Sequence, residues 1–261
     1  MEEVILGKGM MDYLRLTSFE SIVDMIGSPE PDDKVVRKRM QYRGRYYDGV
    51  FIGGGMQAKR AHFMLEASGQ KSDAVWRKLP ESLHATRVDA QVTLPMAWRE
   101  IGKIGDQLRN NAWSGPRRGV RMITNDDRQD TCYIGSRRSA VYIRIYAKGM
   151  PDDMAVRFEI EFKREYADGV WTSVHQGTTL GEIVAGEIWR LPQVPSLRPF
   201  HEWASNWELA EITPVKVISS KRRWIEATCI PALWKMATSH EGNVWLADEL
   251  TRLLEYIRKH K

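Results

Sequence analysis

The sequence has few cysteines and no long apolar run. Its 261 residues include only two cysteines, Cys132 and Cys229, which lie far apart and form no Cys-x-x-Cys motif. This excludes a zinc ribbon or a dithiol redox motif recognisable by spacing, and favours two reduced thiols. No apolar stretch approaches the ~20 residues that cross a bilayer, and residues 1–10 are too acidic for a signal peptide. A cytoplasmic protein with no membrane partner is therefore expected.

Several common catalytic motifs are also missing. The chain has no P-loop sequence and no Gly-x-Ser-x-Gly, and its glycine run at 53–55 lacks the pattern of a dinucleotide site. Its six histidines are never two or four residues apart, so neither a His-Glu-x-x-His zinc site nor the paired histidines of common nicking endonucleases are present. His62 and His84 stay open as isolated metal ligands, although structural roles are expected for both. A metal site would depend mainly on carboxylates.

What the chain does have is positive charge and tryptophan. The formal net charge is +5 and the pI is about 9.1, which favours an anionic partner such as nucleic acid. Ten tryptophans supply material for a core and flat surfaces on which bases can stack.

Hydrophobic periodicity predicts an α+β fold with a mainly antiparallel sheet, one polar catalytic face, packed helices and a helical C-terminus. Strands are expected at 11–18, 46–52, 62–66, 87–94, 141–147 and 156–162, with two more flanking a turn at 125–127. Helices are expected at 19–26, 74–79, from Pro95 onward, at 178–191 behind a threonine cap, at 222–236 and at 243–259. We expect a catalytic domain over 1–195 and a mainly helical extension over 196–261, packed on the same domain.

Three of the expected strands alternate between apolar and polar residues. Alternate side chains of a strand point to opposite faces, so each strand has one apolar and one polar face. The polar residues are Arg87, Asp89, Gln91 and Thr93 in the first strand, Tyr142, Arg144, Tyr146 and Lys148 in the second, and Arg157, Glu159, Glu161 and Lys163 in the third. The short connection at 149–153 predicts that the last two strands pair antiparallel.

Such a face can perform a specific chemistry. Clustered carboxylates bind a hard divalent cation such as Mg²⁺ or Mn²⁺, and a tyrosine beside it can attack phosphorus when a base accepts its proton. Lysine and arginine neutralise the charge that builds on the phosphate. The alternation alone, however, favours a solvated face with cross-strand ion pairs.

The stretch TCYIGSRRSAVYIRIYAKG, residues 131–149, resembles the signature of the replication initiation factor family. This family includes rolling-circle plasmid initiators, filamentous-phage initiators and relaxases of some integrative conjugative elements. Its pattern is a Thr-x-Tyr-x-Gly-Ser-Arg run followed by Arg-x-Tyr-x-Lys. Further similar blocks follow in the family's order over about residues 11–236, namely Asp12-Tyr13-Leu14, HFMLEASGQ at 62–70, Arg87-Val88-Asp89, Arg157-Phe158-Glu159 and Trp224 to Leu233.

The resemblance implies a metal-dependent nicking-closing endonuclease, or relaxase. Such an enzyme cleaves one DNA strand at an origin, joins a tyrosine to the 5′ phosphate and releases a 3′ hydroxyl. Carried over to this chain, the nucleophile is Tyr146, with Tyr133 as the second candidate and Tyr142 as a distant third. Lys148 and Arg144 would lie near the phosphate.

The resemblance also implies a divalent metal, Mg²⁺ or Mn²⁺. Asp89 and Glu159 occupy the family's acidic positions, and Glu161 points to the same face. Two positions depart from the family's pattern, because Gln91 stands where many relatives have a second acid and Ala147 where Asp or Asn is frequent. Both departures concern positions at or near the implied metal ligands.

The expected main partner is single-stranded or supercoiled origin DNA. Five arginines near the motif are candidates for phosphate contacts: Arg117, Arg118, Arg121, Arg137 and Arg138. The resemblance also suggests a homodimer and a host helicase as partners to test. Two other functions remain open, a non-catalytic DNA-binding protein with the same fold and an unrelated α+β protein with charged strand faces.

Overall fold

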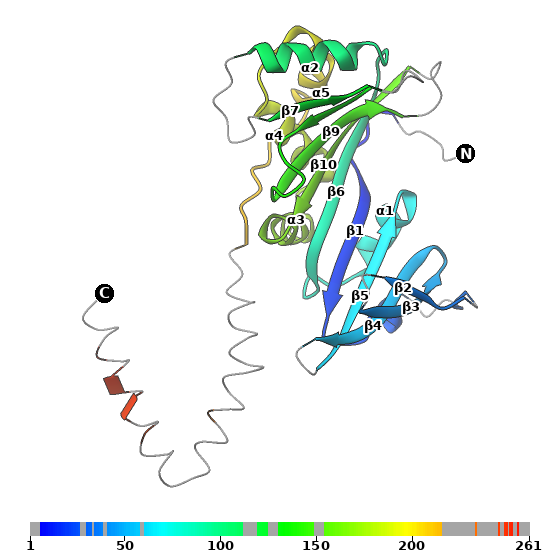
Figure 1. Ribbon diagram of the computed structural model, residues 1–261, viewed down its shortest axis with the longest axis vertical. Helices are drawn as coiled ribbons and strands as arrows, with labels where there is room; N and C mark the ends of the chain where they lie inside the picture. The colour runs from blue at the N-terminus through cyan, green and yellow to red at the C-terminus, as the bar shows by residue number, and fades with distance from the viewer. Residues whose placement is uncertain are drawn as a thin grey trace. The chain divides into compact units, whose positions relative to one another are not determined.

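The computed structural model describes residues 6–26, 30–32, 34–38, 41–57, 60–111, 119–124, 130–148 and 154–215, and a few positions beyond. These residues form one ten-stranded sheet in the order β2-β3-β4-β5-β1-β6-β10-β9-β8-β7, with every neighbouring pair antiparallel (Figure 1). The strands are β1 Met10–Ser18, β2 Val36–Lys38, β3 Tyr42–Tyr47, β4 Val50–Gln57, β5 Arg60–Ser68, β6 His84–Pro95, β7 Val120–Ile123, β8 Thr131–Ile134, β9 Val141–Ala147 and β10 Ala155–Lys163.

Helices pack against the apolar face of this sheet. The described helices are α1 Gln70–Val75, α2 Glu100–Asn110, α3 Glu165–His175, α4 Leu180–Trp189 and α5 Arg198–Ala204. The threonine cap expected for α4 is confirmed. The Thr179 hydroxyl accepts a hydrogen bond from the Glu182 backbone N–H at 3.2 Å, and the Glu182 carboxylate accepts one from the Thr179 N–H at 2.6 Å.

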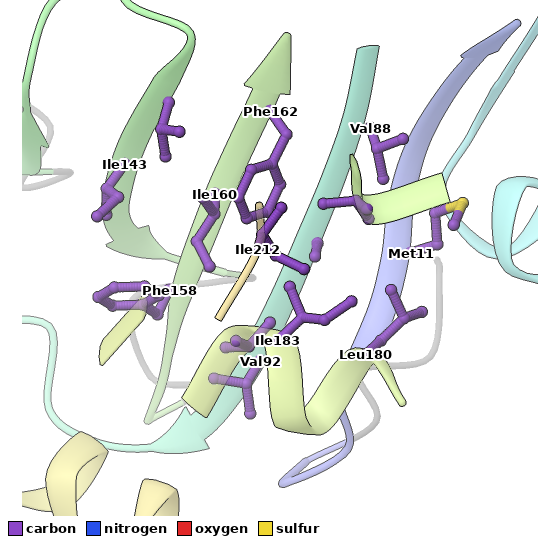
Figure 2. Close-up of a cluster of buried hydrophobic side chains, with 14 of the residues drawn as sticks. Met11, Val88, Val92, Ile143, Phe158, Ile160, Phe162, Leu180, Ile183 and Ile212 are labelled. Atoms are coloured by element: carbon purple, nitrogen blue, oxygen red, sulfur yellow. The ribbon is translucent and has the colours of Figure 1, made fainter. Parts of the chain in front are cut away.

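The alternation read from the sequence builds the core. Val92 of β6 and Phe158 and Ile160 of β10 are fully buried, as is Ile183 of α4, and Figure 2 shows them gathered between the strands and the helix. The expected α+β class with a mainly antiparallel sheet is therefore confirmed. In the strands β6, β9 and β10, whose apolar side chains are covered in this way, the alternating polar residues lie on the other face.

Phe158 gives a test of this packing. Its ring lies 5.4 Å from that of Phe200 in α5, and its side chain is fully buried. Phe158→Ala is expected to lower the free energy of unfolding by about 3–5 kcal/mol, measured by chemical denaturation. The control Met154→Ala removes a side chain that is 62% exposed and should cost far less. Equal costs for the two variants would contradict the described core.

Two local predictions were wrong. Residues 46–52 are not one strand, because Asp48 and Gly49 have φ angles of 47° and 79° and turn the chain between β3 and β4. An Asp-Gly pair suits a two-residue hairpin turn, since both positions need positive φ. The helix expected over 19–26 is only a 3₁₀ turn, Val23–Ile26.

Backbone contacts divide the chain into two compact units, Met1–Val215 and Lys216–Lys261. Helix α5 belongs to the first unit, so this unit extends past residue 195. The functional boundary expected there stays a prediction, and the helices expected at 222–236 and 243–259 lie almost wholly outside the described residues. Among the described helices, none combines the length and apolarity needed to span a membrane.

Candidate active site

Two buried carboxylates meet on the polar face of neighbouring strands. Asp89 of β6 and Glu159 of β10 are each only 1% exposed. The Arg144 guanidinium of β9 forms an ion pair with both, at 3.5 Å to Asp89 and closer to Glu159. Arg87 adds two hydrogen bonds to Asp89, at 2.8 and 2.5 Å. The strand pairing thus brings together acids and bases that are far apart in sequence.

Burial dominates the electrostatics of Asp89. It raises the pKa of this carboxyl to about 7, although Arg87 acts in the opposite direction. The neighbouring charges of Glu159 and Glu161 also raise it. A carboxylate in this setting gains from any additional positive charge.

The Tyr146 hydroxyl is directed at the same carboxylates. It donates a hydrogen bond to Glu159 at 2.6 Å. Burial and the negative charge of Glu159 raise the pKa of Tyr146 above its ordinary value, so the phenol holds its proton in this arrangement. Glu159 is nevertheless placed to accept that proton when positive charge arrives beside the hydroxyl.

Asp89, Glu159, Arg87 and Arg144 border an open cavity of about 300 Å³, whereas Tyr146 is not among the residues that line it. Arg144, Lys148, Asp89 and Glu159 all line it, so four of the predicted site residues share one cavity. The complete lining comprises Asp12, Tyr13, Ser68, Gly69, Arg87, Asp89, Arg144, Lys148 and Glu159. Both positive and negative groups therefore line a space open to solvent.

Asp12 and Tyr13 of β1 were not predicted as site residues. The Asp12 carboxylate accepts a hydrogen bond from Arg157 at 2.8 Å, and Tyr13 lies opposite Asp89 in the β1–β6 pairing. Both residues belong to the block Asp12-Tyr13-Leu14, whose similarity to the family was the only sequence signal for their involvement. Their role depends on pairing between strands about seventy residues apart, which alternation within one strand does not reveal.

Glu161 lies on the polar face but does not line the cavity. It forms ion pairs with Arg87 at 3.2 Å and Lys163 at 2.8 Å. Its assignment as a metal ligand stays a prediction. In this structure its carboxylate pairs with the two neighbouring basic side chains.

Tyr133, like Tyr146, is not among the residues that line the cavity, and it lies opposite Arg144 in the β8–β9 pairing. Its ring stacks on that of Tyr142, with centroids 5.7 Å apart and planes 16° from parallel. Arg121 lies over Tyr133 at 5.0 Å. No carboxylate is bonded to the Tyr133 hydroxyl among the described residues, whereas the Tyr146 hydroxyl is bonded to Glu159.

The five arginines predicted to contact DNA fall into three groups. Arg121 is exposed on β7, and Arg137 and Arg138 are exposed in the turn after β8. Arg117 and Arg118 lie outside the described residues.

The two histidines left open as metal ligands have other partners. His84 forms an ion pair with Asp168 at 2.6 Å, and the His62 ring forms a hydrogen bond with the Tyr42 hydroxyl at 2.6 Å. Neither lines the cavity. Both rings therefore have polar partners within the fold.

The donor chemistry of the cavity suits a hard divalent cation. Asp89, Glu159 and Asp12 all line it and carry the carboxylates that such a cation prefers, and Asp89 and Glu159 both pair with one cation, the guanidinium of Arg144. Within the described part of the chain, no group of three or more His, Cys, Asp or Glu is arranged to hold a metal. A bound metal would therefore need the arginine to release the carboxylates.

The fold resembles that of a solved protein, the rolling circle replication initiator protein from Geobacillus stearothermophilus. The similarity covers 78% of this chain and 93% of that one, with a TM-score of 0.59 and 19% sequence identity. No protein-family model and no curated protein matches the sequence. At this identity the comparison establishes a shared fold.

Proposed function

We propose that this chain cleaves and rejoins one strand of DNA at a replication or transfer origin through a covalent 5′-phosphotyrosine at Tyr146. The observation that carries the proposal is the hydrogen bond from the Tyr146 hydroxyl to Glu159, beside a cavity lined by Arg87, Arg144 and Lys148. A nucleophile, a proton acceptor and phosphate-binding cations occur together. The fold shared with a rolling circle replication initiator supports the same reaction, and with it a role in rolling-circle replication or mobilisation.

The reaction balances with these groups. The Tyr146 oxygen attacks the phosphorus and its proton passes to Glu159, while the bond from phosphorus to the 3′ oxygen breaks. The 3′ oxygen leaves with a proton from water as a hydroxyl. Arg144 and Lys148 neutralise negative charge on the phosphate as it builds. The tyrosine ester conserves the phosphodiester energy, so the reverse reaction rejoins the strand without ATP.

We further propose a divalent cation, Mg²⁺ or Mn²⁺, held by Asp89 and Glu159 with Asp12 on the same cavity wall. When bound, it would polarise the scissile phosphate and favour the deprotonated tyrosine. The raised pKa values of Asp89 and Tyr146 support this role, because both groups ionise more readily beside added positive charge.

A direct test uses supercoiled plasmid DNA that carries the region flanking this chain's gene. With Mg²⁺ or Mn²⁺, the protein should convert it to open circles and to relaxed closed circles. A protein-linked DNA band should persist in detergent. Plasmid lacking that region is the control. Absence of nicking and of linked DNA on flanking-region plasmid and on its single strand would refute the proposal.

One observation favours a second function, a non-catalytic DNA-binding protein. Arg87 and Arg144 already neutralise Asp89 and Glu159, as they would in a site that needs no metal. Such a protein would bind the same DNA in gel-shift assays but form no covalent product at any metal concentration.

The exposed arginines after β8 make a prediction that holds for both functions. If Arg137 and Arg138 bind phosphates, replacing both by alanine should lower the slope of log affinity against log salt by about 0.7 to 0.9 for each phosphate that is no longer neutralised. The matched control replaces Arg77 and Arg198, exposed arginines that pair with acids of their own segments. A slope equal to that of the control would remove Arg137 and Arg138 from the interface.

A further inference from the structure

The strands at the β2 edge of the sheet are unusually basic. The segment 34–47, KVVRKRMQYRGRYY, has no acidic residue. Its own positive charge exceeds the formal net charge of the whole chain, which is +5. Its six basic residues are Lys34, Arg37, Lys38, Arg39, Arg43 and Arg45. Strands β2 and β3 arise from this segment and form an antiparallel pair at one end of the sheet, well away from β9 and β10 (Figure 1).

Two arginines of this pair face each other. In the β2–β3 register Arg37 lies directly opposite Arg43, and both are exposed. Like charges in directly opposed positions destabilise a strand pair. Within the described segments, no ion pair or hydrogen bond from Arg37, Arg43 or Arg45 to an acid is found. The repulsion is therefore uncompensated within the part of the chain that the structure describes.

Protection of the sheet edge does not explain this arrangement. A charged residue on an edge strand discourages pairing with other chains, and a single lysine or arginine is sufficient for this. Lys38 in fact turns to the other face, where it forms an ion pair with Glu66. The opposed pair Arg37 and Arg43 adds repulsion within the hairpin itself, which edge protection does not require.

Glycines fix the backbone of this hairpin against β4. Gly44, between Arg43 and Arg45, lies opposite Gly53. A Cβ atom on Gly44 would lie 1.9 Å from the Ile52 carbonyl oxygen, and one on Gly55 would lie 2.3 Å from that of Gln41. Only glycine permits such close backbones. Gly44 and Gly55 therefore allow the backbone of β3 to lie close to that of β4.

We propose that Arg37, Arg43 and Arg45 bind the phosphate backbone of double-stranded DNA, as a contact separate from the cavity. Phosphates on either side of a groove present closely spaced negative charges, and these would relieve the Arg37–Arg43 repulsion.

The position of the hairpin favours duplex over single-stranded DNA. Strand β3 is four positions from β6, or roughly 20 Å at ~4.8 Å per strand, which is about one duplex diameter. Alternation places the three arginines on the face opposite that of Tyr42, whereas the cavity lies on the Tyr42 face. A duplex held at the hairpin would leave the cavity free for an unpaired strand. This proposal does not require cleavage at Tyr146.

The experiment measures binding of random-sequence duplex DNA and single-stranded DNA by fluorescence anisotropy over a series of salt concentrations, in chelator so that no cleavage occurs. The test variant replaces Arg37, Arg43 and Arg45 by glutamine. The control replaces Arg77, Arg109 and Arg198 by glutamine, which removes the same charge from exposed arginines that have acidic partners. Thermal unfolding of each variant checks the fold.

The test variant should lower the duplex salt slope by roughly 2 to 3 units, with a smaller change for single strands and for the control. Arg43→Gln alone should leave the thermal midpoint unchanged or raise it, since a repulsion is removed. An unchanged duplex slope, or a decrease equal for both DNA forms, would overturn the proposal. The test variant would also be measured for binding to phosphatidylserine vesicles. Weaker vesicle binding with unchanged duplex binding would overturn the proposal, because the arginines would then bind a lipid surface instead of DNA. Because nicking is assayed separately, a failed nicking test leaves this result interpretable.

Discussion

Replacing Tyr146 by phenylalanine is expected to abolish strand nicking and the covalent DNA adduct. The change removes only the hydroxyl, the atom proposed to attack phosphorus, so activity should fall by several orders of magnitude. The ring keeps its packing. Loss of the hydrogen bond to Glu159 should lower the free energy of unfolding by about 1–3 kcal/mol. The loss stays in this range because Arg144 still pairs with the Glu159 carboxylate. Plasmid nicking, DNA anisotropy and thermal unfolding measure the three effects separately.

The matched controls are the neighbouring tyrosines of β8 and β9, Tyr133 and Tyr142. Their rings stack on each other, so Tyr133→Phe and Tyr142→Phe should retain the adduct. An adduct that survives in Tyr146→Phe but disappears in Tyr133→Phe would move the nucleophile and leave the reaction type intact. Full nicking by all three single variants would refute a tyrosine nucleophile on these strands.

Replacing Glu159 by glutamine should produce the next largest loss. The change keeps the side chain's shape but removes the charge that accepts the Tyr146 proton and that is proposed to hold the metal. Cleavage should fall by about 10²- to 10⁴-fold, as expected when a general base is lost. DNA affinity should not fall, because the substitution removes a negative charge that repels the phosphate.

Glu161→Gln is the control on the same strand and face. Glu161 pairs with Arg87 and Lys163 and does not line the cavity, so its loss should reduce cleavage much less than that of Glu159.

Asp89→Asn and excess chelator should each reduce cleavage far more than binding. Undiminished nicking in chelator would remove the metal from the mechanism while keeping Tyr146 and Glu159.

The sequence predicted the sheet's central strands because alternation is a local signal. The apolar faces of β6, β9 and β10 and the cap of α4 followed directly from residue spacing. Helix α3 was not predicted. Its buried Ala167, Val170, Trp171 and Val174 are spaced as on a helix, but Gly169 and the β-branched residues weaken its propensity. Tertiary packing against β6 and β10 supplies what the local sequence lacks.

The candidate site was predictable in its residue types and in the antiparallel pairing of β9 with β10, but not in its side-chain contacts. Alternation placed Asp89, Arg144, Tyr146 and Glu159 on one face, which proved sufficient to bring them together. It did not reveal that Arg144 joins both carboxylates, because that depends on side-chain conformations across three strands. The contribution of Asp12 and Tyr13 was hidden for the same reason, since β1 joins β6 only in the folded sheet.

The most direct test of the central proposal is mass mapping of the protein–DNA adduct. The protein is incubated with DNA from the region flanking its gene and Mg²⁺ or Mn²⁺, then digested with protease and nuclease, and the nucleotide-modified peptide is sequenced. The proposed mechanism predicts a nucleotide joined through its 5′ phosphate to Tyr146. A nucleotide on any other residue, or no modified peptide from DNA that is demonstrably nicked, would contradict it.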